Sequence, residues 1–358
     1  RPAGAAGHLG ASALTSAAIR VLLVDDSRVD LAVLERLMAP IAGVDVVATA
    51  TSGAEALRLI EEHLPDVVCT DLMMPEMDGL ELTKRIMATH PTPILAVSSI
   101  VDDPESAFPL LQAGALDFFP KPSPAPGEEA SNRRDLAQKL RVLSKVYVFR
   151  HRTRATRSTD DAASLAGGPR EALATPGRQI PPYRVALIGA STGGPQAVQL
   201  ILSRLPADFP IPICIVQHIS AGFLAAFTTW LDKTTAPSVR VAEHGARPTA
   251  GFVYLAPEGK HLAFGPAGQF ELRTTARSEG HRPSISVMFE SAAEVFRERC
   301  ISVLLTGMGR DGGLGMKALS DVGAMTIAQD ADSCVVYGMP REAAELGAVK
   351  RVLPPRAI

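Results

Sequence analysis

A serine in a glycine-rich turn is the first residue of this sequence that could do chemistry. Ser191 lies in the run Gly189-Ala-Ser-Thr-Gly-Gly194, directly after the apolar stretch Val185–Ile188. That stretch has the length of one buried parallel strand, and Pro195 with the periodic apolar residues after it predicts a helix. We therefore expect Ser191 on a tight turn at a helix N-terminus, with its hydroxyl exposed and backbone N–H groups facing whatever it attacks.

This turn alone is compatible with three roles. It can simply join a strand to a helix, as many glycine-rich turns do. It can bind phosphate, but the dinucleotide fingerprint with its downstream acid and the Gly-Lys-Ser of a P-loop are both missing from it. It can carry a nucleophile, since Gly189-Ala-Ser-Thr-Gly193 fits the nucleophile-elbow pattern, which is a weak signal by itself. The rest of the chain has to distinguish these roles.

A histidine and an aspartate follow two further predicted strands in the same half of the chain. His218 follows Pro212–Gln217, and Asp311 lies in the loop after Ile301–Leu305. Because functional groups collect at the carboxyl ends of parallel strands, we expect both residues to share a sheet edge with Ser191. A serine needs a base, and the base needs a carboxylate that holds its tautomer and stabilises its charge. The pattern predicts a triad, and its order along the chain differs from the Ser, acid, His order of the elbow fold.

Three further histidines and two backbone N–H groups are also assigned roles by the pattern. His244, His261 and His281 lie in stretches that we interpret as polar loops, where a solvated or substrate-contacting role is expected. The backbone N–H groups of Thr192 and Met308 are the candidates for an oxyanion hole.

A second group of candidates lies in the first third of the chain. Asp25 and Asp26 end one predicted strand, Asp71 ends another, and Ser98 and Lys121 follow two more. Three carboxylates at one edge repel each other unless a cation binds, and such oxygen ligands suit Mg²⁺. An aspartate beside Mg²⁺ can accept a phosphoryl group. Asp25 and Asp26 taken alone could also be a helix N-terminal cap.

Alternating apolar runs and amphipathic segments predict the scaffold of these sites. The strands expected in the first third are Ile19–Val24, Val44–Ala48, Asp66–Thr70, Ile94–Val97 and Leu116–Phe119. Strands alternating with helices indicate a doubly wound, five-stranded parallel sheet of the flavodoxin-like type. The second half predicts another parallel α/β sheet and a β-hairpin around the turn 265–268.

The predicted organisation has two folded domains, and composition agrees with it. The expected segments are a disordered leader 1–18, a domain 19–150, a flexible linker 151–182 and a domain 183–355. A helix that closes the first domain has one basic face, with Arg133, Arg134, Lys139, Arg141 and Lys145, which we expect to be solvated rather than bound to nucleic acid.

Charge and cysteine usage narrow the partners and the compartment. The net charge of −2 gives no long-range attraction to nucleic acid or anionic membranes, and no apolar run approaches the ~20 residues that span a bilayer. The four cysteines are far apart, which predicts buried free thiols in the reducing cytoplasm.

The first domain resembles the receiver domains of two-component systems. The run Asp71-Leu-Met-Met-Pro75-Glu-Met-Asp-Gly79 is similar to the receiver segment around the phosphorylated aspartate. The resemblance implies that Asp71 is the phosphoacceptor and that Asp25, Asp26 and Asp71 hold Mg²⁺. It also implies that Ser98 and Lys121 form the switch pair, with Phe118 as the aromatic switch residue.

The second domain resembles the chemotaxis protein-glutamate methylesterases, the CheB family. The motifs that carry the resemblance are Gly189-Ala-Ser-Thr-Gly-Gly194, Val216-Gln-His218, Tyr254-Leu-Ala-Pro257, His281-Arg-Pro-Ser284, Leu305-Thr-Gly-Met-Gly-Arg-Asp-Gly312 and Ser333-Cys-Val-Val-Tyr-Gly-Met-Pro340. The resemblance implies a cytoplasmic serine hydrolase that removes methyl groups from glutamate esters of chemoreceptors and deamidates receptor glutamines. It implies activation by a chemotaxis histidine kinase and no cofactor for the esterase reaction. In the resting state we expect the receiver to cover the Ser191 edge.

Two departures from the family pattern and two alternative functions complete the expectations. Ser286 stands where an acid is expected, and Ile219-Ser220 replaces a more usual Met-Pro. We expect neither to touch the triad and both to affect receptor recognition. The alternatives are a paralogous regulator of a non-flagellar receptor array and a non-catalytic response regulator that binds a partner.

Overall fold

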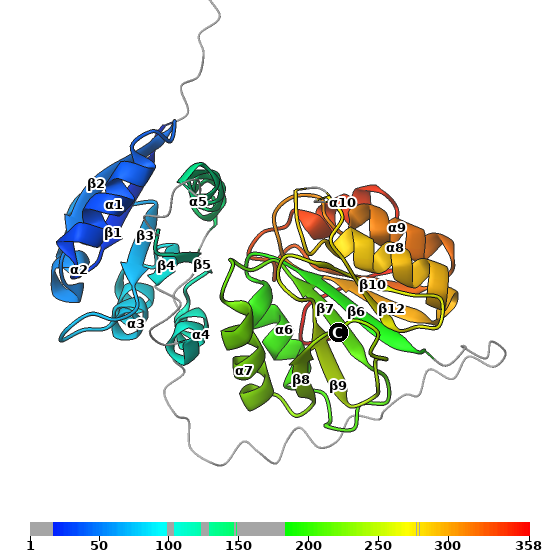
Figure 1. Cartoon of the computed structure of the whole chain (residues 1–358). Helices are drawn as coiled ribbons and strands as arrows, with labels where there is room; N and C mark the ends of the chain where they lie inside the picture. Colours follow the sequence, from blue (N-terminus) through cyan, green and yellow to red (C-terminus); the bar gives the residue numbers. More distant parts are fainter. Residues whose placement is uncertain are drawn as a thin grey trace, which may run out of the picture.

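The computed structural model describes residues 17–98, 104–122, 129–146, 148, 183–276, 278 and 280–358. The predicted linker 151–182 and all but the last two residues of the predicted leader 1–18 lie outside the described residues. The described chain forms two α/β domains that lie side by side (Figure 1).

The N-terminal domain is a five-stranded parallel sheet with helices on both faces. Its strand order is β2-β1-β3-β4-β5. The strands are β1 (Ile19–Val24), β2 (Val44–Ala50), β3 (Val67–Asp71), β4 (Ile94–Ser98) and β5 (Asp117–Pro120). The helices are α1 (Arg28–Met38), α2 (Gly53–His63), α3 (Gly79–Thr89), α4 (Pro104–Ala113) and α5 (Glu129–Leu143). The predicted five-stranded fold is confirmed.

Local sequence explains where these helices begin. Ser27, Ser52 and Asp78 each accept a hydrogen bond from a backbone N–H in the first helical turn, which caps α1, α2 and α3. Helices α1 and α5 cover one face of the sheet, because the apolar residues of both belong to one buried cluster. The opposite face is covered by α2, α3 and α4. The central strands β3 and β4 are therefore buried on both sides along their whole length.

The C-terminal domain is built on a seven-stranded parallel sheet in the order β14-β13-β12-β6-β7-β9-β8. Its strands are β6 (Val185–Ala190), β7 (Ile213–Gln217), β8 (Ser238–Val241), β9 (Phe252–Leu255), β12 (Cys300–Leu304), β13 (Met325–Gln329) and β14 (Arg351–Leu353). Its helices are α6 (Gly194–Leu202), α7 (Leu224–Thr234), α8 (Ile285–Phe296), α9 (Gly313–Asp321) and α10 (Met339–Glu345). A short 3₁₀ turn spans Arg297–Arg299.

The predicted hairpin is present and the last strand is the main omission. Strands β10 (His261–Phe264) and β11 (Phe270–Arg273) pair in antiparallel register. We expected His261 in a polar loop, but it begins β10 and is fully buried, so that expectation was wrong. Strand β14 was not predicted, because a strand of three residues at a sheet edge carries almost no periodic signal.

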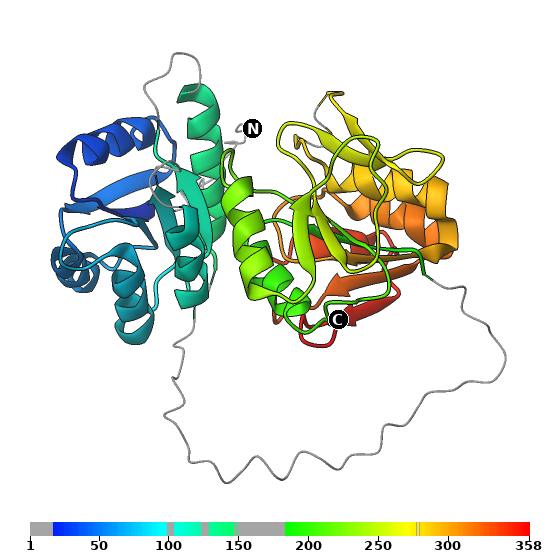
Figure 2. The same cartoon turned by 60° about the horizontal axis from the view of Figure 1, so that its bottom comes forward.

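Alternating residues along β6 supply two cores. Val185 and Leu187 pack with α8, α9 and α10, whereas Ala186 and Ile188 pack with α6 and α7. The core formed with α6 and α7 continues into the N-terminal domain, because α4 of that domain packs against both helices. The two domains therefore meet through helices of adjoining layers (Figure 2).

Aromatic side chains make up the centre of this junction. Phe108 on α4 stacks on Trp230 of α7 with ring centroids 4.9 Å apart, and Phe118 on β5 stacks on Phe223 at 5.2 Å. Phe108 and Phe118 also contact each other edge to face at 5.3 Å. The side chain proposed as the aromatic switch is thus part of the contact between the domains.

Candidate active site

The turn after β6 places Ser191 as the sequence predicted, between a buried strand and a helix N-terminus. The backbone N–H of Ser191 donates to the carbonyl of Thr306 at 3.1 Å. Gly193 has φ +75, a conformation that side chains disfavour. A β-carbon at Gly194 would collide with the carboxamide of Gln217. The glycines therefore allow the chain to reverse tightly beside β7.

Strand register brings the histidine next to the serine. Ala190 on β6 pairs with Gln217 on β7, so Ser191 and His218 are the next residues of two neighbouring strands. The backbone N–H of His218 donates to the carbonyl of Ala190 at 2.9 Å. Both side chains line one cleft of about 840 Å³.

The histidine is held by the predicted aspartate. Nε2 of His218 lies 2.9 Å from Oδ2 of Asp311, and their side chains are only 9% and 1% exposed. Asp311 follows β12, which pairs with β6 on the side opposite β7. The carboxylate is ionised and acceptor-only, so Nε2 carries the proton of this hydrogen bond.

Hydrogen bonds from the start of α8 fix this carboxylate. Asp311 accepts from the hydroxyl of Ser284 at 2.8 Å, from the N–H of Ile285 at 2.8 Å and from the N–H of Ser286 at 2.9 Å. Burial alone would raise the pKa of Asp311, but the bond to His218 and these N–H groups lower it well below its usual value. Asp311 therefore stays charged and can stabilise an imidazolium on His218.

Nδ1, the other ring nitrogen of His218, makes no such bond. It is buried, and no hydrogen-bond partner for it exists within the part of the chain that the structure describes. The Ser191 hydroxyl is therefore not bonded to His218, although the two residues share the cleft. Apo sites often have such open geometry, and their hydrogen bonds shorten only when substrate is bound.

One carboxamide joins the backbones of the serine and the histidine. Nε2 of Gln217 donates to the carbonyl of Ser191 and to the carbonyl of His218, both at 2.8 Å. Gln217 was not predicted to have a role, although it belongs to the quoted motif Val216-Gln-His218. Ser284 was missed as well, although it belongs to the quoted motif His281-Arg-Pro-Ser284.

The expectation about the two family departures was wrong for Ser286. It is buried, its N–H bonds Asp311, and its hydroxyl accepts from the N–H of Gly312 at 2.8 Å. It therefore supports the carboxylate and is not part of a recognition surface. Ile219 and Ser220 line the cleft, and the Ser220 hydroxyl donates to the carbonyl of Phe118 at 3.3 Å.

The other three histidines differ in their surroundings. His244 accepts a hydrogen bond from the N–H of Leu272 at 3.2 Å. His261 is buried, and its Nδ1 accepts from the N–H of Ser284 at 3.2 Å. His281 stacks on His218 with ring centroids 3.8 Å apart.

The N-terminal domain forms one wall of the cleft. The C-terminal domain contributes the oxyanion candidates Thr192 and Met308 to the cleft. The N-terminal domain contributes Asp117 and Lys139. The Thr192 hydroxyl donates to Oδ2 of Asp117 at 3.0 Å, and the same oxygen pairs with Lys139 at 2.9 Å. The expectation of a solvated basic face on α5 was therefore wrong for Lys139, whose side chain is only 13% exposed.

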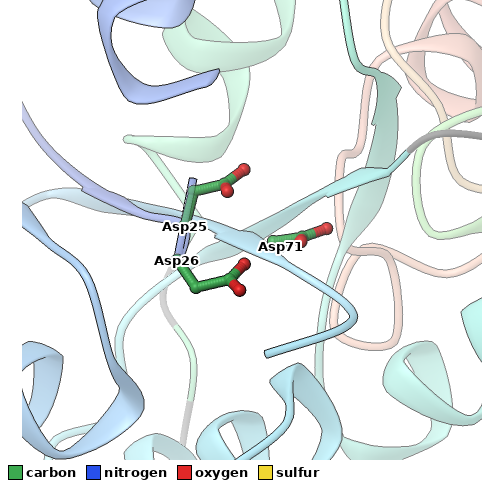
Figure 3. Close-up of side chains that lie close together, drawn as sticks. All are labelled: Asp25, Asp26 and Asp71. Atoms are coloured by element: carbon green, nitrogen blue, oxygen red, sulfur yellow. The ribbon is translucent and has the colours of Figure 1, made fainter. Parts of the chain in front are cut away.

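The acidic cluster lies at the carboxyl edge of the first sheet. Asp25, Asp26 and Asp71 offer carboxylate oxygens that all lie within 4.8 Å of one another (Figure 3). Burial raises the pKa of Asp25 and of Asp71, more than the nearby ammonium of Lys121 lowers it. An oxygen-only cluster with excess negative charge fits the preferences of Mg²⁺.

Lys121 is the cation that balances part of this charge. Its Nζ lies 2.8 Å from Asp25, 3.0 Å from Asp30 and 3.1 Å from Asp71. Burial alone would lower the pKa of Lys121, but these carboxylates raise it above its usual value. Ser98 ends β4 and is buried, and β4 pairs with both β3 and β5, the strands of Asp71 and Phe118.

Comparison with known protein families agrees with this architecture. Residues 21–128 match the family model described as response regulator receiver domain, and residues 186–358 match the one described as CheB methylesterase. Two sheets, each with its polar groups at the carboxyl edge, define the class: a response regulator whose receiver domain is joined to a hydrolase domain.

Similar proteins cover nearly the whole chain. A Geobacter metallireducens protein named protein-glutamate methylesterase/protein-glutamine glutaminase 4 is 41% identical over 95% of this chain and 96% of its own length. The corresponding protein 2 of Anaeromyxobacter dehalogenans is 42% identical over 95% and 96%. The solved Thermotoga maritima CheB methylesterase catalytic domain is 38% identical over 49% of this chain and 94% of that chain, with a TM-score of 0.47. The chain belongs to the CheB methylesterase family. Within its described part, no helix has both the length and the apolar character needed to cross a membrane.

Proposed function

We propose that this protein is a phosphorylation-activated methylesterase that hydrolyses glutamate methyl esters of chemoreceptors and deamidates specific receptor glutamines. Relatives with these activities in their names match it over nearly their full length. The observation that carries the chemistry is the buried pair of His218 and Asp311 in the cleft that Ser191 lines. The proposed extents are 19–150 for the receiver and 183–355 for the esterase, joined by 151–182.

The ester reaction follows from the hydrogen bond between His218 and Asp311. Because Asp311 occupies Nε2, Nδ1 of His218 takes the proton as the Ser191 oxygen attacks the ester carbonyl. The tetrahedral intermediate collapses, the bond to the methoxy oxygen breaks, and methanol leaves with the proton from Nδ1. Water then attacks the acyl-enzyme, gives its proton to the same nitrogen, and frees a glutamate and the Ser191 hydroxyl.

The same steps account for glutamine deamidation, with ammonia as the leaving group in place of methanol. In both reactions negative charge develops on the carbonyl oxygen. The N–H groups of Thr192 and Met308, which share the cleft with Ser191, are the proposed donors to it. Each such donor contributes about 3 kcal/mol to transition-state stabilisation in comparable sites.

Regulation is proposed to act through the wall that the receiver contributes to the cleft. The unphosphorylated receiver holds Thr192 through Asp117 and restricts access for a receptor helix. After a histidine kinase phosphorylates Asp71, Ser98 and Lys121 would contact the phosphoryl group. Phe118, which stacks on Phe223 of the esterase domain, would then shift. Asp25, Asp26 and Asp71 would hold the Mg²⁺, which neutralises charge on the phosphoryl group.

The proposed location is the cytoplasm. The four cysteines all lie in the described part of the chain, and all are free thiols. A reducing compartment would keep them in this state. The receptor's cytoplasmic part and the kinase would be the partners there, with no nucleic acid and no insertion into the membrane.

Methanol release from methylated receptor membranes tests the proposal. The rate is measured with the full chain, with and without Mg²⁺ and a small phosphoryl donor, and with Asp71→Asn as the matched variant. The parent should release methanol faster with the donor, whereas the variant should show the basal rate only. A parent chain that releases no methanol under either condition would contradict the esterase function. Equal rates with and without the donor would contradict only the activation.

A further inference from the structure

His281, the first residue of the motif His281-Arg-Pro-Ser284, lies against His218 but has no part in the reaction proposed above. The ring of His281 lies on the ring of His218 with centroids 3.8 Å apart and planes only 8° from parallel. Such a short, nearly parallel contact covers one face of the imidazole that must exchange protons with Ser191. Both rings belong to the wall of the same cleft.

Hydrogen bonds hold the backbone around His281, the residue that stacks on His218. Ser278 and His281 form an isolated antiparallel bridge, with N–H to carbonyl distances of 2.9 and 3.1 Å. A guanidinium nitrogen of Arg282 donates to the carbonyls of Thr274 and Thr275 at 3.3 and 3.1 Å. The stacking ring is therefore carried by a segment with several of its own hydrogen bonds.

Three residues further along, the same segment reaches the other side of His218. The Ser284 hydroxyl and the N–H of Ile285 bond the carboxylate of Asp311, which bonds Nε2 of His218. The hydrogen bond fixes the rotation of the ring within its plane, and the stack fixes the plane itself. Within the described residues Nδ1 has no partner that could do either.

We propose that His281 is a positioning residue, whose flat ring holds the plane of His218 so that Nδ1 meets the Ser191 oxygen. This inference rests on the proposed serine mechanism and adds a component outside the triad. The feature that this role requires of His281 is a flat ring. Phenylalanine should therefore replace it, whereas a side chain of similar size without a flat face should not.

Two measurements on the phosphorylated full chain test this role. One is methanol release, resolved into kcat and KM. The other is the labelling rate of Ser191 by a fluorophosphonate, in which the serine oxygen bonds phosphorus, fluoride leaves, and His218 takes the serine proton. The second measurement needs no receptor and reports how well His218 activates Ser191.

His281→Leu and His281→Ala should slow labelling and kcat by about 10- to 100-fold at unchanged KM, because a small misplacement of a catalytic group costs up to roughly 10²-fold. His281→Phe should restore most of both. His244→Ala, the same change at a histidine away from the cleft, should leave both rates unchanged. Thermal unfolding of each variant identifies any that fail to fold. If His281→Ala does not fold, the comparison of His281→Leu with His281→Phe still tests the role.

Each contrary outcome overturns the proposal in a recognisable way. A rise in KM with normal labelling would make His281 a substrate contact. A phenylalanine variant as slow as the leucine variant would show that the imidazole nitrogens matter, and not the ring stack. Normal rates in all variants would leave the stack without function. A parent chain that is not labelled at Ser191 would overturn the serine mechanism itself, and the role of His281 with it.

Discussion

The carboxyl edges of the two parallel sheets differ in how their charges are balanced. At the first edge, Lys121 is shared by Asp25, Asp30 and Asp71, and burial raises the pKa of two of these acids. At the second edge, one carboxylate, Asp311, has a full set of donors and a depressed pKa. The first edge has negative charge to spare and favours a metal ion and a phosphoryl group. The second is balanced and leaves one nitrogen free to exchange protons.

The largest expected effect comes from removing Ser191, the proposed nucleophile at the second edge. Ser191→Ala should lower kcat for methanol release by on the order of 10⁶, because triad residues act as a unit. The rate is measured on methylated receptor membranes with the phosphorylated chain. Ser203→Ala is the control, since the Ser203 hydroxyl donates to the carbonyl of Leu200 at the end of its own helix. Near-normal turnover by the Ser191 variant would remove the chemical difference between the two edges.

The next effect tests the charge balance at Asp311. Asp311→Asn should lower kcat by roughly 10⁴, because the amide does not hold the tautomer with the proton on Nε2. Asp321→Asn is the control, as Asp321 is an exposed acid that pairs with Lys317 within its own helix. A loss of less than tenfold would show that the bond between His218 and Asp311 is structural.

The same substitution gives a prediction for stability against pH. Since the pKa of Asp311 is lower in the folded chain, its ionised form stabilises the fold at every pH above its unfolded pKa of ~4. This contribution is lost as pH falls through the folded pKa. Urea unfolding should therefore show parent and Asp311→Asn apart by about 1–3 kcal/mol at pH 6–8, with the difference shrinking below pH ~4. A difference that stays constant down to pH 3 would contradict the depressed pKa.

Both edges were predictable because each depends on a rule about strands. A polar residue directly after a buried parallel strand lies at the sheet's carboxyl edge, and this placed Ser191, His218 and Asp71 correctly at strand ends. The rule gives neighbours in a sheet but not the loops above it. The stack of His281 on His218 and the support of Asp311 by Ser286 therefore could not be foreseen, since both depend on how the start of α8 approaches the edge.

Contacts between the domains were beyond sequence reasoning for a different reason. Asp117 and Thr192 are 75 residues apart along the chain, with the linker between them. Their hydrogen bond depends on the relative placement of two separately folded sheets, and no periodic pattern encodes that placement. Lys139 was assigned to solvent for the same reason, because its amphipathic helix shows a polar face whether water or another domain covers it.

The excess negative charge of the first edge gives a smaller effect on stability. A carboxyl whose pKa is raised on folding is destabilising in its ionised form above its unfolded pKa. Asp25→Asn should therefore raise the melting temperature at pH 7.5 without Mg²⁺ by a few degrees, since ~1 kcal/mol corresponds to roughly 4 °C for a domain of this size. Added Mg²⁺ should stabilise the parent and not this variant. Asp45→Asn, an exposed acid on β2, is the control. A variant that gains as much stability from Mg²⁺ as the parent would place the ion elsewhere.

The smallest effect concerns the contact between the two domains at Asp117, which begins β5 one residue before Phe118 and accepts a hydrogen bond from the Thr192 hydroxyl. If this bond helps to hold the receiver over the cleft, Asp117→Ala should raise the unphosphorylated rate of methanol release by up to about tenfold, because 1.4 kcal/mol shifts a two-state equilibrium by that factor. The phosphorylated rate should not change, since the contact is already released in that state. Asp135→Ala is the matched control, an acid on the same cleft wall with no hydrogen bond to the esterase domain among the described residues. An unchanged basal rate in Asp117→Ala would mean that the aromatic contacts of Phe108 and Phe118 hold the receiver over the cleft. The receiver would then act on the esterase domain through packing alone.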